Sequence, residues 1–186
     1  MNEVLQTIKN RRSVREFKSD PIRKEDIEIM VEAGTYAPSG HNQQPWLFIV
    51  IQDREMMYAF SEECKAAMSR IPVEWIKKTG SDLNLDLTHG APVLVIIASQ
   101  KRAVTGRTDC TAAMENMLLA AESLGISSCW MSSLMFIADD RGAIREFGVP
   151  DGYLAQQAAV FGYMAEGCEE EKYERRTDVV NYIGEF

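Results

Sequence analysis

The chain has 186 residues, of which 46% are hydrophobic and 26% charged, and it carries a net charge of -8. This length suits one domain with its own hydrophobic core, here residues 1–186, and the composition excludes disordered and fibrous classes. The acidic balance disfavours a nucleic-acid partner, because proteins that bind nucleic acids present basic surfaces.

Cysteine usage and the N-terminal sequence point to a reducing compartment. Four cysteines and two histidines occur, with no C-x-x-C spacing, so neither a disulfide framework nor a metal site is expected. The first residues lack the basic and apolar regions of a signal peptide. The apolar run at residues 93–98 is far too short to span a bilayer. We therefore expect a cytoplasmic protein with no membrane partner.

Hydrophobic spacing predicts helices and strands mixed along the chain. Helices are expected over residues 2–10, 23–36, 54–70, 108–124 and 138–147, strands over 46–52, 93–99 and 155–163, and extended chain at 11–17 and 126–132. The helix at 108–124 is apolar on much of its circumference, which suits either a subunit-crossing helix or a core helix within one chain. Residues 71–89 fit no single element, and a lid is one interpretation.

A basic segment follows the first predicted helix. Its sequence is Arg11-Arg12-Ser13-Val14-Arg15, in chain where alternate side chains share a face. Arg11, Ser13 and Arg15 would then present two guanidinium groups and a hydroxyl together, a set that suits a terminal phosphate. A solvated basic stretch with surface ion pairs has the same spacing, so the pattern alone leaves both interpretations open.

Polar side chains are concentrated in the loop at residues 38–46, with the sequence PSGHNQQPW. Its amide and hydroxyl groups, held between two prolines, could hydrogen-bond the edge of a polar heterocycle. A helix-to-strand turn has a similar composition and is the commoner structure.

Two further segments are candidates for a binding site. Residues 125–133 (GISSCWMSS) could bring backbone N–H groups beside a flat ring, or they form a buried strand after a glycine cap. Cys129 has no evident Asp or His partner, so a packing role is favoured over a nucleophilic one. Arg175 and Arg176 form a second basic pair, near the other end of the chain.

These segments together resemble the nitroreductase family of FMN-dependent oxidoreductases. Residues 11–17 (RRSVREF) are similar to that family's phosphate-binding strand, and residues 37–46 (APSGHNQQPW) to its flavin loop. Residues 113–133 resemble its central dimer helix and the strand beneath the flavin. No G-x-G-x-x-G motif follows a strand and no P-loop occurs, so a bound nucleotide must be held by side chains.

The resemblance implies an α+β fold, with a central, mostly antiparallel sheet flanked by helices, in an intertwined homodimer with shared FMN sites. It implies that the ribityl phosphate and the pyrimidine side of FMN bind Arg11, Ser13 and Arg15, with Arg12 adding to the phosphate site. It implies that the loop from the other subunit contacts the same flavin through Pro38, Ser39, Gly40 and Asn42, with Gln44 shaping the loop. Ser132 or Ser133 would offer a backbone N–H to flavin N5, and Arg175 or Arg176 would complete the phosphate pocket.

The implied activity is reduction of nitroaromatics, quinones or related small electrophiles with NADH or NADPH, by ping-pong hydride transfer. No residue is assigned as a general acid or base, because the flavin carries the redox chemistry. Two alternatives stay open at this stage. One is a protein that stores or senses FMN without turnover, and the other is a specialised branch that performs dehalogenation or flavin fragmentation.

Overall fold

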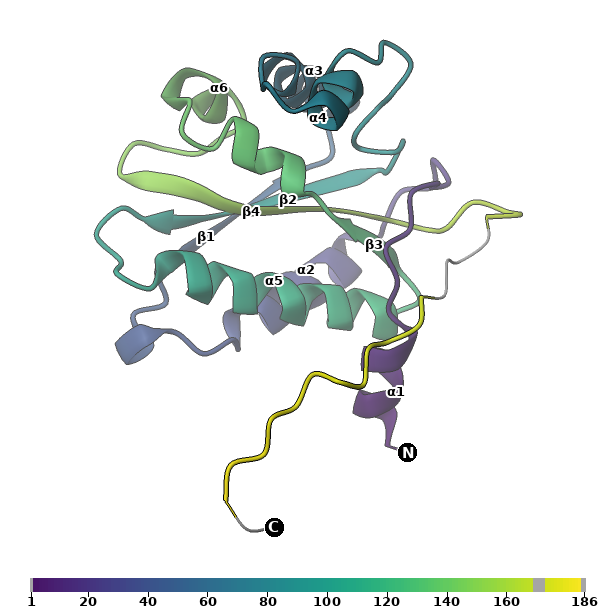
Figure 1. Ribbon diagram of the computed structural model, residues 1–186, viewed down its shortest axis with the longest axis vertical. Helices are drawn as coiled ribbons and strands as arrows, with labels where there is room; N and C mark the ends of the chain where they lie inside the picture. The colour runs from purple at the N-terminus through teal and green to yellow at the C-terminus, as the bar shows by residue number, and fades with distance from the viewer. Residues whose placement is uncertain (1, 169–172, 185–186) are drawn as a thin grey trace.

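An antiparallel sheet of four strands runs through the middle of the protein (Figure 1). The computed structural model describes residues 2–168 and 173–184. The strands are β1 (Trp46–Ile51), β2 (Val93–Gln100), β3 (Ser127–Trp130) and β4 (Tyr153–Gly162), in the spatial order β1-β2-β4-β3. Every pairing between them is antiparallel, which confirms the expected α+β sheet.

Helices cover both faces of this sheet (Figure 1). One face carries α2 (Lys24–Thr35) and α5 (Gly106–Ser123), and the other carries α3 (Arg54–Met68), α4 (Glu74–Gly80), α6 (Arg141–Glu146) and the short helix η2 (Ser132–Phe136). α1 (Glu3–Asn10) packs against α5, and η1 (Gly40–Asn42) is a single turn before β1. In the described part of the chain, no helix is both long and apolar enough to cross a membrane.

The central strand β2 is continuously apolar because both faces of the sheet are covered. Alternate side chains enter two separate cores. Leu94, Ile96 and Ala98 pack on the α3 side, and Val93, Val95 and Ile97 pack on the α5 side. All six are 0% exposed. Burial on both faces explains why this strand shows no alternation of polar and apolar residues.

Most predicted elements are confirmed, with shifts at their ends. The last helix begins only at Arg141, because the Asp140 carboxylate accepts hydrogen bonds from the next backbone N–H groups and caps it there. The extended chain predicted to reach residue 132 ends at Trp130, and Ser132 starts η2. Residues 71–89 contain a helix, α4, that the sequence did not predict. It has seven residues and buries none of them, so it leaves no periodic apolar signal.

Helix α5 buries one side in the core of its own chain. Its buried residues, among them Ala113, Met114 and Met117, face the core between α5, α2 and the sheet. The remaining side carries polar residues such as the exposed Thr108 and Glu115, together with the partly exposed Ala112, Leu119 and Ala120. The helix therefore packs in the core of its own chain and keeps a partly apolar surface on its other side.

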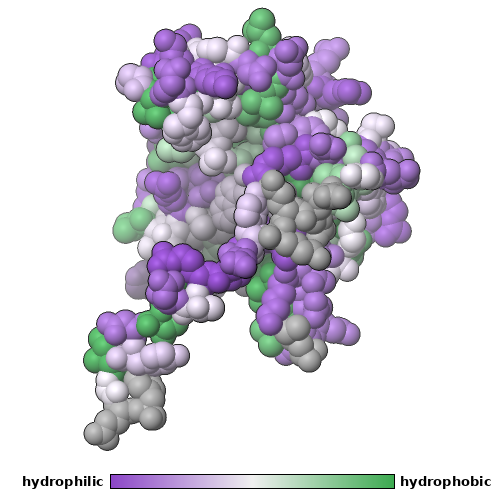
Figure 2. Space-filling view, turned by 45° about the vertical axis from the view of Figure 1, so that its right-hand side comes forward, coloured by the Kyte–Doolittle hydropathy of each residue, from purple (hydrophilic) through white to green (hydrophobic). Residues whose placement is uncertain are grey.

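Two terminal segments expose apolar side chains. α1 has no buried residue, and its Val4, Leu5 and Ile8 are 65%, 48% and 49% exposed. Residues 173–184 leave the body of the protein as an extended arm that is exposed along its whole described length (Figures 1 and 2). Apolar surface on segments of this kind is typical of a protein interface.

Candidate functional site

A cavity of about 250 Å³ lies beside η2 and the end of β3. Six parts of the chain form its walls: the basic segment after α1, the end of α3, α4, the turn before β2, β3 and η2. Its polar lining includes Arg15, Thr79, His89, Ser132 and Ser133. Two of the segments singled out in the sequence, residues 11–17 and 125–133, therefore meet at one place.

The basic segment is held against the edge strand β3. Ser13 forms a parallel bridge with Ser128, and the Val14 N–H donates to the Ser128 carbonyl at 2.9 Å. Val14 points inward and is only 4% exposed. Alternation along extended chain then places Arg11, Ser13 and Arg15 on the outward side, as the sequence predicted.

The electrostatic environment at this edge is positive. In residues 2–168 and 173–184, the guanidinium groups of Arg11 and Arg15 have neither an ion-pair nor a hydrogen-bond partner. Burial raises the pKa of the Cys129 thiol, and the charges of Arg15 and Arg11 oppose that rise. Burial lowers the pKa of His89, and the charge of Arg15 lowers it further, against a smaller opposite effect of Asp86. Two cations without counter-ions give this edge a positive potential that favours an anion.

Arg12 faces a different environment. Its guanidinium donates hydrogen bonds to the carbonyl groups of Lys9, Asn10 and Arg11, at the end of α1. The main contact of this side chain is therefore with a helix C-terminus, where positive charge is favourable. Its Nε is buried and has no hydrogen-bond partner in the described residues.

The two serines that begin η2 differ in their surroundings. Ser133 is 9% exposed, and its hydroxyl hydrogen-bonds the buried Cys64, whose pKa burial raises to about 12. Ser132 is exposed at the cavity wall. The first N–H groups of a helix have no partner within it, and the residues that carry them here, Ser132 and Ser133, line the cavity. Cys129 and Cys64 are both buried, as expected of packing cysteines.

The proline-flanked loop is a rigid structure attached to the start of α5. The Gly40 N–H donates to the Asp109 carboxylate at 3.2 Å, and the Thr105 hydroxyl donates to the same carboxylate at 2.9 Å. A Cβ on Gly40 would collide with that hydroxyl, so glycine is required here. Within the loop, the Gln44 N–H donates to the Ser39 hydroxyl and the Gln44 side chain to the Asn42 side chain. Asn42, Gln44 and His41 all have positive φ.

This loop lies far from the cavity of its own chain. It is bound to the first turn of α5, whereas the basic segment pairs with β3, which follows the last turn of α5 (Figure 1). The helix has 18 residues, so its ends are about 27 Å apart at the usual rise per residue. The structure therefore does not bring Pro38, Ser39, Gly40, Asn42 and Gln44 to the basic segment within one chain.

The second basic pair also lies apart from the cavity lining. Arg175 and Arg176 belong to the exposed C-terminal arm. The Arg176 guanidinium pairs with the Asp178 carboxylate at 3.1 Å. Neither arginine is among the residues that line the cavity.

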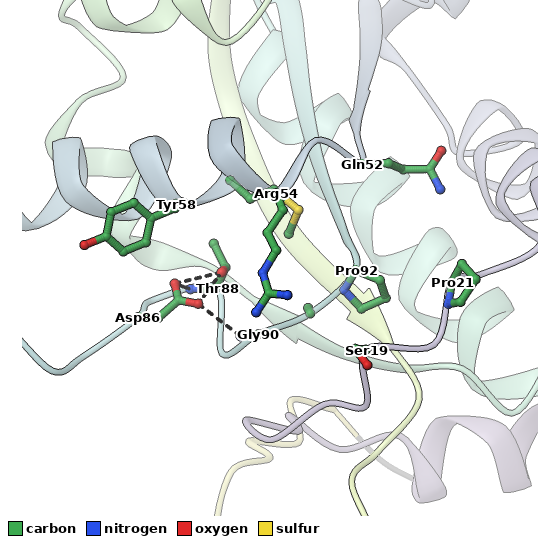
Figure 3. Close-up of a pocket in the computed structure, with 11 residues that line it drawn as sticks. Ser19, Pro21, Gln52, Arg54, Tyr58, Asp86, Thr88, Gly90 and Pro92 are labelled. Atoms are coloured by element: carbon green, nitrogen blue, oxygen red, sulfur yellow. Dashed lines mark hydrogen bonds between the residues drawn. The ribbon is translucent and has the colours of Figure 1, made fainter.

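Residues 71–89 supply a wall that the sequence reasoning missed. Trp75 and Thr79 come from α4, and Leu87 and His89 come from the turn before β2. The same turn lines a second hollow of about 310 Å³ through Asp86, Thr88 and Gly90, opposite Arg54 of α3 (Figure 3). One signal in the sequence could have indicated this turn. A His-Gly pair stands directly before a buried strand, and two such residues often mark a left-handed turn.

Comparisons with known proteins define the class. The sheet with helices on both faces is similar to that of solved nitroreductases. The solved "Nitroreductase with Bound FMN" from Bacteroides fragilis superimposes with a TM-score of 0.91 at 33% identity, over 99% of this chain and 100% of that one. The family model "Nitroreductase family" matches residues 8–163. The chain belongs to the nitroreductase family.

Two relatives of this chain carry names that indicate different activities. A "Putative NADH dehydrogenase/NAD(P)H nitroreductase" from Archaeoglobus fulgidus is 34% identical over 169 residues, which cover 88% of this chain and 86% of that protein. An "Iodotyrosine deiodinase" from Thermotoga neapolitana is 28% identical over 128 residues, or 64% of this chain and 68% of that protein.

Proposed function

We propose that the chain is an FMN-dependent oxidoreductase that takes electrons from NADH or NADPH and passes them to small electrophiles such as nitroaromatics and quinones. The observation that carries the proposal is the pair of unpartnered guanidinium groups in the basic segment, Arg15, which lines the cavity, and Arg11, four residues before it. Support comes from the FMN-bound Bacteroides fragilis relative and from the NAD(P)H nitroreductase name of the Archaeoglobus fulgidus protein.

The residues present fit FMN. A phosphate needs positive charge and N–H donors, and the guanidinium groups of Arg11 and Arg15 supply both. A flat polar ring needs donors along its edge, and the start of η2 at Ser132 supplies backbone N–H groups. Bound FMN would supply a ring that accepts and donates hydride, and the chain would supply position and electrostatics.

The protein's own contribution is orientation. Arg15 would hold the ring from the basic segment, Ser132 would hold it from η2, and Trp75 of α4 would exclude water from the cavity mouth. We assign no general acid or base, because the described lining holds no carboxylate. The buried, unpaired thiols of Cys64 and Cys110 support a reducing compartment, and we place the enzyme in the cytoplasm.

We further propose that each FMN site is shared between two chains. The cavity of one chain, at about 250 Å³, is below the range of about 300–1,000 Å³ for small-molecule sites. A two-fold axis across the middle of α5 would bring the loop end of one chain to the basic end of the other. The exposed apolar face of α1 and the C-terminal arm would supply the interface, and Arg175 or Arg176 would reach the phosphate from there.

The first test is reconstitution. The flavin-free protein should bind FMN stoichiometrically, and NADH or NADPH should then bleach the flavin absorbance under anaerobic conditions. Riboflavin should bind much more weakly because it lacks the phosphate that the arginines attract. A protein that binds FMN but is never bleached by either donor would instead be a store or sensor of FMN. No gain of a flavin spectrum would reject the proposal.

Steady-state kinetics should show parallel double-reciprocal lines when donor and acceptor are varied together. The reason is that one cavity serves both, so the oxidised nicotinamide must leave before the acceptor enters. Initial rates with NADPH and a quinone would provide the measurement. Lines that intersect would show a ternary complex and contradict the single shared cavity.

Reductive dehalogenation is the second candidate. It is favoured by the similarity to the Thermotoga neapolitana deiodinase, and by Trp75, a 67% exposed ring at the cavity wall that could stack on a halogenated phenol. An acceptor screen that contains iodophenols beside quinones and nitroaromatics separates the two. Release of iodide at a rate above nitroaromatic reduction would favour this branch.

A further inference from the structure

The turn before β2 places a histidine in an unfavourable backbone conformation. His89 has φ +55 and Gly90 has φ +70. Glycine adopts such angles freely, but a histidine there pays a conformational cost. Conformations of this kind persist where the surrounding structure fixes them, and they cluster at ligand sites. The side chain of His89 is therefore the feature to explain.

Hydrogen bonds on both sides hold His89 in this conformation. The Asp86 carboxylate accepts from the Thr88 N–H at 2.8 Å and from the Gly90 N–H at 3.1 Å (Figure 3). The Asp86 carbonyl accepts from the His89 N–H at 3.0 Å. The backbone N–H groups of Thr88, His89 and Gly90 therefore all have hydrogen-bond acceptors, which fixes the backbone that carries the imidazole.

Side chains of helix α3 also hydrogen-bond the segment that leads into this turn. The buried Lys65 ammonium donates to the Leu85 carbonyl at 2.9 Å. The Leu87 N–H donates to the Ser61 hydroxyl at 2.8 Å. The position of His89 is therefore set by a helix of the core.

The held imidazole lines the basic cavity. His89 shares that lining with Arg15, Cys129 and Ser132, whereas its two neighbours in the chain, Thr88 and Gly90, line the second hollow. Two charged groups act on it, Arg15 from the basic segment and Asp86 from its own turn. The other titratable group that lines the cavity is the Cys129 thiol, which burial keeps protonated.

We infer that His89 is a flavin-contacting residue, whose imidazole hydrogen-bonds the polar pyrimidine edge of the ring beside Arg15; this inference rests on the proposed FMN site. That edge alternates carbonyl acceptors with an N–H donor. Burial and Arg15 lower the pKa of His89, so its imidazole is neutral at pH 7 and has one donor and one acceptor nitrogen. A neutral His89 imidazole can therefore hydrogen-bond the carbonyl or N–H groups of this edge, and it adds no positive charge to that of Arg15.

Lumiflavin, the flavin ring without ribityl phosphate, separates ring contacts from phosphate contacts. His89→Asn and His89→Gly keep a residue that tolerates positive φ and remove the imidazole. Both variants should bind lumiflavin and FMN about fivefold more weakly, as expected for one hydrogen bond. Their melting temperatures without flavin should be unchanged or higher by a few degrees, about 2–4 °C, because strain is relieved.

The comparison variant is Arg11→Ala, which should weaken FMN and leave lumiflavin unchanged. Titration by quenching of flavin fluorescence gives both dissociation constants. Unchanged lumiflavin affinity in both His89 variants would overturn the inference, and so would a large loss of thermal stability, which would mark His89 as structural. Failure of the wild-type protein to bind FMN would reject the proposed function itself, which is a different outcome.

Discussion

Arg11→Ala is expected to weaken FMN binding by about tenfold to a hundredfold. The Arg11 guanidinium is half-buried and has no partner in the described residues, so its interaction with a phosphate is not offset by the loss of an existing ion pair. A charge-assisted hydrogen bond contributes about 1.5–3 kcal/mol, which corresponds to that range. Equilibrium titration of the flavin-free protein with FMN measures the change.

Arg145→Ala is the matched control for loss of one positive charge. Arg145 lies in α6, pairs with Asp151 at 2.6 Å and takes no part in the cavity lining. Its variant should bind FMN as the wild type does. Equal effects of the two substitutions would show that only net charge matters, and an unchanged dissociation constant for Arg11→Ala would remove Arg11 from the phosphate site.

Leu5→Glu combined with Ile8→Glu is expected to abolish dimerisation and FMN binding together. Both side chains lie on the exposed apolar face of α1, at 48% and 49% exposure in one chain. Carboxylates buried in an apolar interface would carry a large desolvation penalty. Because each proposed site contains residues from both chains, FMN binding and assembly are thermodynamically linked. Light scattering should fall from twice the 21.0 kDa chain mass to that mass.

Met56→Glu provides the control, because Met56 is a 38% exposed apolar residue on α3, on the opposite face of the sheet. That variant should remain a dimer that holds FMN. A wild-type protein that is monomeric at micromolar concentration and still holds FMN would refute the shared site, together with the assignment of Pro38, Ser39, Gly40 and Asn42 to it.

Local patterns in the sequence predicted the fold well. Alternation in the basic segment correctly separated Arg11, Ser13 and Arg15 from the buried Val14, because extended chain fixes the direction of successive side chains. The continuous apolar run of β2 correctly indicated burial on both faces. The element that the sequence did not predict is the short helix α4, because it buries none of its seven residues and leaves no periodic apolar signal in the sequence.

The candidate site was predictable only in pieces. Arg15 of the basic segment and Ser132 and Ser133 of η2, all singled out in the sequence, line one cavity, whereas Arg11, Arg12 and Ser13 are not part of its lining. The sequence could not predict that the length of α5 separates these residues from the proline-flanked loop. A resemblance to a family gives the order of motifs along the chain and not their positions in space. His89 was missed because its significance lies in its backbone angle and its position beside Arg15, and neither can be read from residue type.

The placement of the two half-sites at opposite ends of α5 has a genetic consequence. In the shared-site arrangement, a chain with a defective basic segment and a chain with a defective loop are each inactive as homodimers. When they assemble with each other, both defects fall in the same site, and the second site receives the intact segment of one chain and the intact loop of the other. Two loss-of-function alleles of this gene would therefore complement one another within the heterodimer, whereas two alleles damaged at the same end of α5 would not.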